Sequence, residues 1–187
     1  MKILRTSAFK VFMLLTERLA GKGWGGFKPI GAIYGYLRRI LMPKQDFLLD
    51  IQGHKMFVHG QHSKGDCDEL PFTNSYEKEQ TILFRKLVDE GMNVVDIGAN
   101  IGYYTLLAAE LVGEKGKVFA FEPEPSNYDL LLRNVEINGY KNVTVVRKAV
   151  SNETGESSLF LSQKGFGNTV CMIRLAAGGP LRSTRSA

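Results

Sequence analysis

Two acids and two glycines stand at spacings typical of a site for a nucleotide-containing cofactor. Asp96 lies in a run of apolar residues, and Gly98 and Gly102 follow it within a short turn. Glu122 closes a second apolar run about 20 residues after Gly102. Glycine lets a ligand approach the backbone closely, and a carboxylate offers two oxygens that match the two hydroxyls of a ribose. These residues therefore predict the loop and the acid of a cofactor site.

Alternating apolar runs and helical patterns position these residues. The β-branched run at 93–97 is typical of a strand that is buried on both faces. Further strands are expected near 117–122 and 143–147, with helices near 102–112 and 126–138 between them. Helical crossovers of this length make the strands parallel. The sequence thus predicts an α/β fold with a parallel sheet.

The spacing of the glycines separates two classes of cofactor. A dinucleotide-binding fold carries G-x-G-x-x-G after its first strand, whereas residues 96–102 read D-x-G-x-x-x-G. This second order fits S-adenosylmethionine-dependent methyltransferases better. Either acid alone is better explained as a turn cap or a solvated strand end, with the glycines forming a tight corner. The whole set, on a strand–helix–strand pattern, favours the cofactor site.

Residues 94–155 closely resemble the FkbM-type methyltransferases, which have a class I, Rossmann-like methyltransferase fold. The resemblance covers roughly residues 76–161, and its most specific parts are residues 96–104 and 121–125. It implies S-adenosyl-L-methionine as the cofactor. The residues that it places around this cofactor are Asp96, Gly98, Ala99, Asn100 and Gly102 at the methionine part, Glu122 at the ribose, and Pro123, Ala149, Val150 and Ser151 near the adenine.

The resemblance extends over only the first half of the parallel sheet of such a fold. The FkbM pattern would continue with a fourth core strand carrying a K-x-D-x-E-G type motif, which this sequence does not contain. No residue in the matched region is a convincing general base, so the catalytic residues are unknown. We therefore expect a C-terminally truncated chain that lacks the acceptor half, followed by an irregular tail over 166–187.

Three functions are compatible with this pattern. The resemblance implies an S-adenosylmethionine-dependent methyltransferase that methylates an oxygen of a small molecule or glycan. The first alternative is a non-catalytic fragment that retains a cofactor half-site, because the acceptor half is not found. The second is an NAD-dependent oxidoreductase, which the missing G-x-G-x-x-G disfavours.

The net charge of +5 is concentrated at the N-terminus. Residues 1–45 hold nine Lys or Arg against one acid, and apolar residues recur there at helical spacing. This basic amphipathic helical arm could pack on its own domain, which is favoured, or lie on an anionic membrane surface. Nucleic acid is disfavoured as a partner because no recognition motif appears. We expect a cytoplasmic protein, with a peripheral membrane location as the alternative, and the oligomeric state is open.

Residues 46–74 predict a hairpin about Gly53 followed by a loop. The methyltransferase domain is expected over 75–165, and its first helix would be capped by Asn74 or Ser75. The apolar residues expected on the inner face of this helix are Ile82, Leu83, Leu87 and Val88. The two cysteines lack the spacing of metal ligands, and the three histidines within residues 54–62, which could suggest a metal, are better explained by the hairpin, so no metal is expected.

Overall fold

The computed structural model describes residues 7–9, 11–12, 36–37, 40–60, 77–153, 155, 157–160 and 172–175. Within them, strands β3 (Asn93–Ile97), β4 (Lys117–Phe121) and β5 (Val143–Val146) form a parallel sheet in the order β3-β4-β5. Helix α5 (Tyr103–Val112) connects β3 to β4, and α6 (Pro125–Ile137) connects β4 to β5. The predicted α/β fold with a parallel, Rossmann-like sheet is confirmed, and each of these elements agrees with its expected range to within about two residues.

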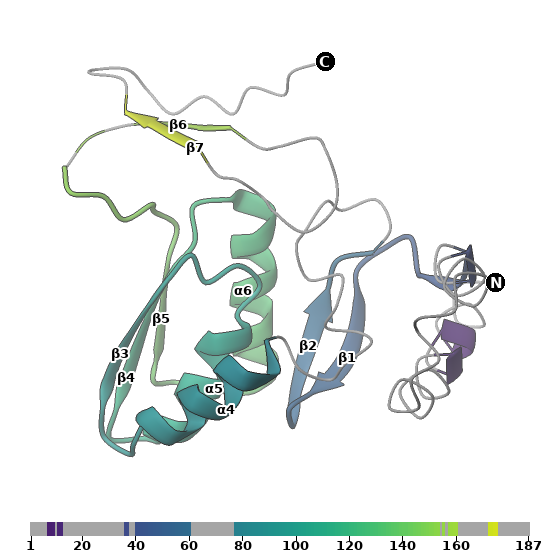
Figure 1. The fold of residues 1–187 in the computed structure, drawn as a ribbon, viewed down its shortest axis with the longest axis horizontal. Coiled ribbons are helices and arrows are strands. Elements are labelled where there is room, and N and C mark those ends of the chain that lie inside the picture. Colours follow the sequence, from purple (N-terminus) through teal and green to yellow (C-terminus); the bar gives the residue numbers. More distant parts are fainter. Residues whose placement is uncertain are drawn as a thin grey trace.

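Helices α4 (Lys78–Leu87), α5 and α6 all lie on one side of this sheet, between the sheet and an antiparallel hairpin (Figure 1). The hairpin consists of β1 (Phe47–Ile51) and β2 (His54–Val58). Its turn places Gln52 at φ 52° and Gly53 at φ 87°, the left-handed conformation that a two-residue hairpin turn requires. The predicted hairpin is therefore present, whereas the division of the chain into domains stays a prediction.

Two asparagines on α6 attach the hairpin to the core. Asn134 is fully buried, accepts a hydrogen bond from the Phe57 N–H (2.6 Å) and donates to the Phe57 carbonyl (3.1 Å) and to the Ile101 carbonyl (2.8 Å). One turn later, Asn138 pairs with both backbone groups of Lys55. The free edge of β2 is thus satisfied by side chains, so Asn134 and Asn138 are not the surface amides that their polarity suggests.

The apolar core lies between the helices, the inner face of the sheet and the hairpin. Its fully buried centre comprises Ile101, Leu106, Leu107, Ala120 and Leu131. The same cluster extends to the hairpin and to Phe9, whose ring packs edge-on against Phe47 at 5.4 Å. This contact shows that a described part of the N-terminal arm packs on the hairpin. Most of residues 1–45, and the cap candidates Asn74 and Ser75, lie outside the described residues.

The expected inner face of α4 is wrong for three of its four residues, whereas Val88, directly after the helix, packs against the core. Ile82, Leu83 and Leu87 are 48%, 55% and 62% exposed, whereas Thr81 is buried. The helix begins at Lys78, behind Glu77 in a left-handed conformation, and not directly after Asn74 or Ser75. Hydrophobic spacing alone identified an apolar stripe on α4, but the part of the chain that the structure describes places nothing over it.

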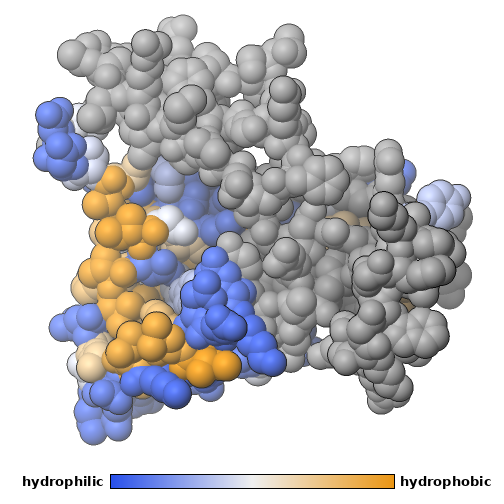
Figure 2. Space-filling view, in the orientation of Figure 1, coloured by the Kyte–Doolittle hydropathy of each residue, from blue (hydrophilic) through white to orange (hydrophobic). Residues whose placement is uncertain are grey.

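The far face of the sheet is also bare in the described part of the chain. Val95 and Ile97 point away from the helices and are 57% and 62% exposed. Figure 2 shows apolar side chains gathered on this side of the molecule. A parallel sheet normally has both faces covered, so the expectation of a strand buried on both faces is not met in β3.

A second hairpin, β6 (Ser157–Phe160) with β7 (Met172–Leu175), follows the parallel sheet. Strand β7 falls within the tail that was expected to be irregular over 166–187, so this expectation is wrong at residues 172–175. Backbone pairing with β6 stabilises a strand there. None of the helices in the described residues is both long and apolar enough to span a bilayer.

Candidate functional site

The glycine loop after β3 is shaped by three residues with positive φ: Gly98 (79°), Asn100 (51°) and Gly102 (97°). This backbone lets the N–H groups of Gly98 and Ala99 both donate to the Phe121 carbonyl, at 2.9 and 3.0 Å. The loop is therefore attached to the end of β4. Since carboxyl ends of parallel strands share one edge of the sheet, residues after β3 and β4 meet there.

Gly102 has a packing role. A Cβ at this position would lie 2.6 Å from Cδ1 of Leu131, a fully buried residue of α6. Gly102 therefore allows α5 to begin close against α6. In contrast, a Cβ on Gly98 would meet nothing within 4 Å, so the backbone of Gly98 faces open space where a ligand can approach.

Glu122 connects the two turns at this edge. Its carboxylate accepts hydrogen bonds from the Asn100 N–H (2.8 Å) and the Glu124 N–H (2.9 Å), and the residue is only 5% exposed. Burial raises the pKa of Glu122, while the two backbone hydrogen bonds oppose this rise. Each oxygen accepts one N–H and keeps a further lone pair, so the carboxylate can still bind two hydroxyls.

Asn100 provides an independent sign of a ligand. Its Oδ1 atom is buried and has no hydrogen-bond partner among the described residues. A buried acceptor is normally paired, so this oxygen is suited to a donor group of a bound molecule. The orphaned oxygen, the open space at Gly98 and the free lone pairs of Glu122 together fit the nucleoside and amino-acid parts of the predicted cofactor.

Asp96 is held differently. Its Oδ2 accepts the Thr105 hydroxyl at 2.5 Å, which joins β3 to the first turns of α5. Burial raises the pKa of Asp96, and the Thr105 hydrogen bond opposes the rise. This carboxylate therefore orients the helix that follows the loop. Its assignment to the methionine part of the cofactor stays a prediction.

The residues expected near the adenine follow the ends of β4 and β5. Pro123 is half-buried directly after Glu122. Ala149, Val150 and Ser151 are exposed beyond β5, and the Ser151 hydroxyl donates to Asn152 Oδ1 at 3.2 Å. The topology places them at the same edge of the sheet as the loop, and contact with a cofactor stays a prediction.

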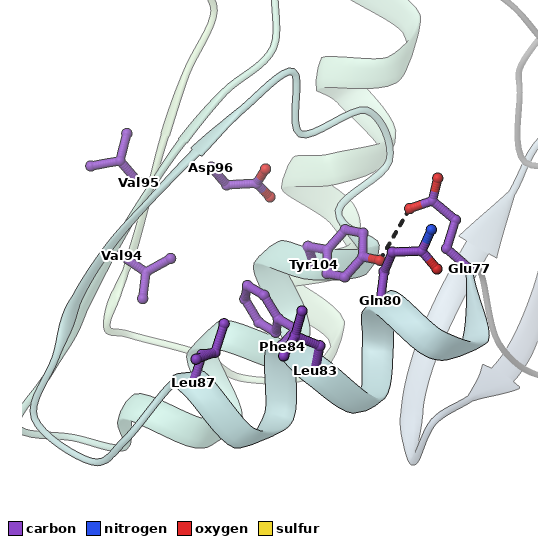
Figure 3. A pocket seen from close by; sticks show the side chains of 9 residues that line it. All are labelled: Glu77, Gln80, Leu83, Phe84, Leu87, Val94, Val95, Asp96 and Tyr104. Carbon is purple, nitrogen blue, oxygen red and sulfur yellow. Dashed lines mark hydrogen bonds between the residues drawn. The ribbon is translucent and has the colours of Figure 1, made fainter.

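A pocket of about 400 Å³ opens beside this site, between α4 and β3 (Figure 3). Val94, Phe84 and Leu87 supply apolar walls, and the Tyr104 hydroxyl donates to Glu77 at 3.2 Å. Burial, the largest cause, raises the pKa of Tyr104 to about 12. Asp96 also reaches the pocket, but Glu122 and the open side of Gly98 lie outside its lining. The pocket is therefore distinct from the site predicted around Glu122.

Sequence reasoning missed one group of residues at the site. His59 follows β2 directly, and its Nε2 lies 3.1 Å from Asn127 Oδ1 in the first turn of α6. The spacing of Asn127, Asn134 and Asn138, seven and four residues apart on one helix face, was the signal that could have revealed this contact with the hairpin.

The model of the TRM5/TYW2 methyltransferase domain matches residues 56–173, more than half of the chain. The chain belongs to the TRM5/TYW2 methyltransferase domain family. The match includes the glycine loop, Glu122 and Asn127. The cofactor prediction, S-adenosyl-L-methionine, is confirmed at the level of this family.

Individual relatives match shorter parts of the chain. A protein-L-isoaspartate O-methyltransferase of Methanococcoides burtonii is 48% identical over 59 residues, covering 32% of this chain and 29% of that protein. The structure of Trm5b from Pyrococcus abyssi is 17% identical with a TM-score of 0.46, covering 65% and 34%. That of M. jannaschii TYW2 in complex with AdoMet is 24% identical with a TM-score of 0.42, covering 55% and 43%. The matched part of the chain covers 26% to 50% of the length of each of eight curated relatives.

These comparisons correct two expectations. The FkbM-type assignment is wrong, because the matching family is TRM5/TYW2. The residues quoted for FkbM lie in the cofactor half that many methyltransferases share, which explains the error. The small-molecule or glycan acceptor and the expectation that nucleic acid is an unlikely partner are also wrong, because the matching family is TRM5/TYW2 and curated relatives are named protein-L-isoaspartate O-methyltransferases. Membership of a methyltransferase family likewise argues against the NAD-dependent oxidoreductase.

Proposed function

We propose that this chain supplies the S-adenosylmethionine-binding part of an RNA methyltransferase. The observation that carries the proposal is the buried Glu122 carboxylate, which is held by N–H groups from both turns within the region matched by the TRM5/TYW2 family. The cofactor supplies an activated methyl group on a sulfonium, so the protein mainly has to hold donor and acceptor in line.

Different residues of the chain would bind different parts of the cofactor. Glu122 would accept hydrogen bonds from the ribose hydroxyls, and Gly98 would let the ligand approach the loop backbone. Asn100 Oδ1 would accept a hydrogen bond from the amino-acid part. We assign no general base, since none of the described residues at the site is placed to take a proton from an acceptor.

RNA is the favoured acceptor for two reasons. The match to the TRM5/TYW2 methyltransferase domain family favours a nucleic-acid acceptor. In addition, the excess of eight positive charges in residues 1–45 would attract a polyanion. A protein carboxylate is the second candidate, because the M. burtonii protein-L-isoaspartate O-methyltransferase is 48% identical over the 59 residues that match.

Transfer of a labelled methyl group tests both candidates. The purified chain is incubated with methyl-labelled S-adenosylmethionine and either total tRNA or an isoaspartyl peptide, with Glu122→Ala and Glu136→Ala as variants. Glu136 is an exposed acid on α6 and serves as the matched control. We expect Glu122-dependent label in RNA that survives Glu136→Ala. If only the peptide is labelled, protein and not RNA is the acceptor. If neither is labelled, the proposal that this chain takes part in methyl transfer is refuted.

A further inference from the structure

Strand β3 lies at one edge of the parallel sheet in the part of the chain that the structure describes. It pairs with β4 on one side, and no described strand pairs with it on the other. The N–H and C=O groups on that other side can therefore accept a further strand. The same strand exposes Val95 and Ile97 on the bare face of the sheet. An edge that is unpaired and also apolar is typical of a surface that binds another chain.

The apolar surface continues from β3 onto α4. Leu83 and Leu87 of α4 are largely exposed, and both line the pocket between this helix and β3. Phe84 from the helix and Val94 and Val95 from the strand line the same pocket (Figure 3). A segment that lay along the edge of β3 would therefore cover apolar side chains of both elements.

The polar side chains of this pocket are acidic or neutral. Its lining contains two carboxylates, Asp96 and Glu77, together with Gln80 and Tyr104, and it contains no Lys or Arg. Asp96 extends from β3 towards Tyr104, whose hydroxyl donates to Glu77 at 3.2 Å (Figure 3). The Asp96 carboxylate accepts one hydroxyl, from Thr105, and keeps further lone pairs. A partly buried carboxylate gains most from an opposite charge, so the pocket is suited to a cation.

We propose that this edge binds an extended segment of a second protein, which adds to β3 as a strand and inserts one Lys or Arg side chain into the pocket towards Asp96 and Glu77. Hydrogen bonds along the β3 main chain would supply affinity, and the pocket would select the basic side chain. The inference goes beyond the proposed function, because it concerns a protein partner and a pocket whose lining includes neither Glu122 nor Gly98.

Charge decides between this partner and two other occupants. Two copies of this chain that paired through β3 would bring two Asp96 carboxylates into one short interface, where like charges are destabilising. An RNA segment would place phosphates against Asp96 and Glu77. A strand with one basic residue instead pairs with the carboxylates and covers the apolar side chains around them.

Hydrogen exchange on the full chain, without cofactor, tests where such a segment binds. The probe is a short capped peptide of Val and Thr with one central Lys. It should slow exchange of the β3 amides and leave those of β5, the other edge strand of the sheet, unchanged. Protection of β5 and not β3 would overturn the proposal. Amides of β3 that are as protected as those of β4 before the peptide is added would overturn it too, because the edge would then be covered within the chain.

Fluorescence anisotropy with the labelled peptide tests the role of charge. Replacing its Lys by norleucine should weaken binding about tenfold, since a charge-assisted hydrogen bond is lost. Asp96→Asn and Glu77→Gln in the protein should each weaken binding of the Lys peptide and reduce its advantage over the norleucine peptide. The matched control is Glu136→Gln, an exposed acid on α6, which should change the affinity less than about twofold.

Three results would contradict the charge-selective strand. The first is equal affinity for the two peptides, and the second is the absence of saturable binding to chain that circular dichroism shows to be folded. The third is a dimer, detected by light scattering, that excludes the peptide from β3 and is unaffected by Asp96→Asn. In that case a second copy of this chain, and not a second protein, occupies the edge.

Discussion

Asp96 lies within β3 and Glu122 directly follows the neighbouring strand β4, but the two carboxylates make different contacts. Glu122 is buried and accepts N–H groups from Asn100 and Glu124, one on each turn. Asp96 is partly exposed and accepts the hydroxyl of Thr105, on the helix that follows its own strand. Glu122 thus joins two segments that are distant in sequence, whereas Asp96 fixes a local connection.

This difference shows which acid organises the site. The contacts of Glu122 form only when both loops are in place. They therefore depend on the folded edge of the sheet. Asp96 would keep its contact with Thr105 in an isolated strand and helix. We therefore expect changes to the loop and to Glu122 to have large effects, and changes to Asp96 to have small ones.

The loop that presents the Asn100 N–H to Glu122 should be the most sensitive part. Gly102→Ala combines a positive φ of 97° with a Cβ that would lie 2.6 Å from Leu131, so we expect a loss of about 2–4 kcal/mol in the free energy of unfolding. Gly98→Ala is the matched control: its φ is 79° but its Cβ would meet nothing within 4 Å. The loss there should be about 1 kcal/mol, from backbone strain alone. Urea denaturation of both variants checks this, and equal losses would contradict the packing role of Gly102.

Neutral replacements of the two acids should separate them further. Glu122→Gln has one acceptor oxygen for two backbone N–H groups, so one buried N–H is left unsatisfied, at a cost of about 1–3 kcal/mol. Asp96→Asn keeps an oxygen for the Thr105 hydroxyl and should cost less than about 1 kcal/mol. Thermal unfolding at neutral pH measures both. A larger loss for Asp96→Asn than for Glu122→Gln would reverse the comparison.

The smallest effect should appear in the pH dependence of stability. Burial raises the pKa of Asp96 in the folded protein, so protonation favours folding. This contribution is fully present below the ordinary pKa of about 4 and is lost as the pH rises through the raised value. The free energy of unfolding of the wild type relative to Asp96→Asn should therefore fall as the pH rises above about 4. A difference that rises over this range would show that the folded-state pKa is lowered instead.

The sequence predicted the parallel core well because its signals are local. The β-branched run before Gly98, Pro125 at the first turn of α6 and Gly139 just beyond its C-terminal end each indicate a boundary from nearby residues. The glycine loop and Glu122 were also predicted, since their spacing along the chain is the signal itself.

What the sequence did not predict depends on contacts between distant segments. An apolar stripe on α4 does not reveal what covers it, and the exposed Leu83 and Leu87 show this directly. The burial of Asn134 depends on the edge of β2, which is 77 residues away. The family was misassigned because the shared cofactor half carries little information about the acceptor.

Calorimetric titration of S-adenosylhomocysteine into the wild type and Glu122→Ala tests the central claim, that Glu122 binds the cofactor ribose. We predict saturable binding that Glu122→Ala weakens more than about tenfold, or 1.4 kcal/mol, while Glu136→Ala leaves the affinity unchanged. Circular dichroism would confirm that each variant is folded. Equal affinity of the wild type and a folded Glu122→Ala would remove Glu122 from the site and contradict the claim.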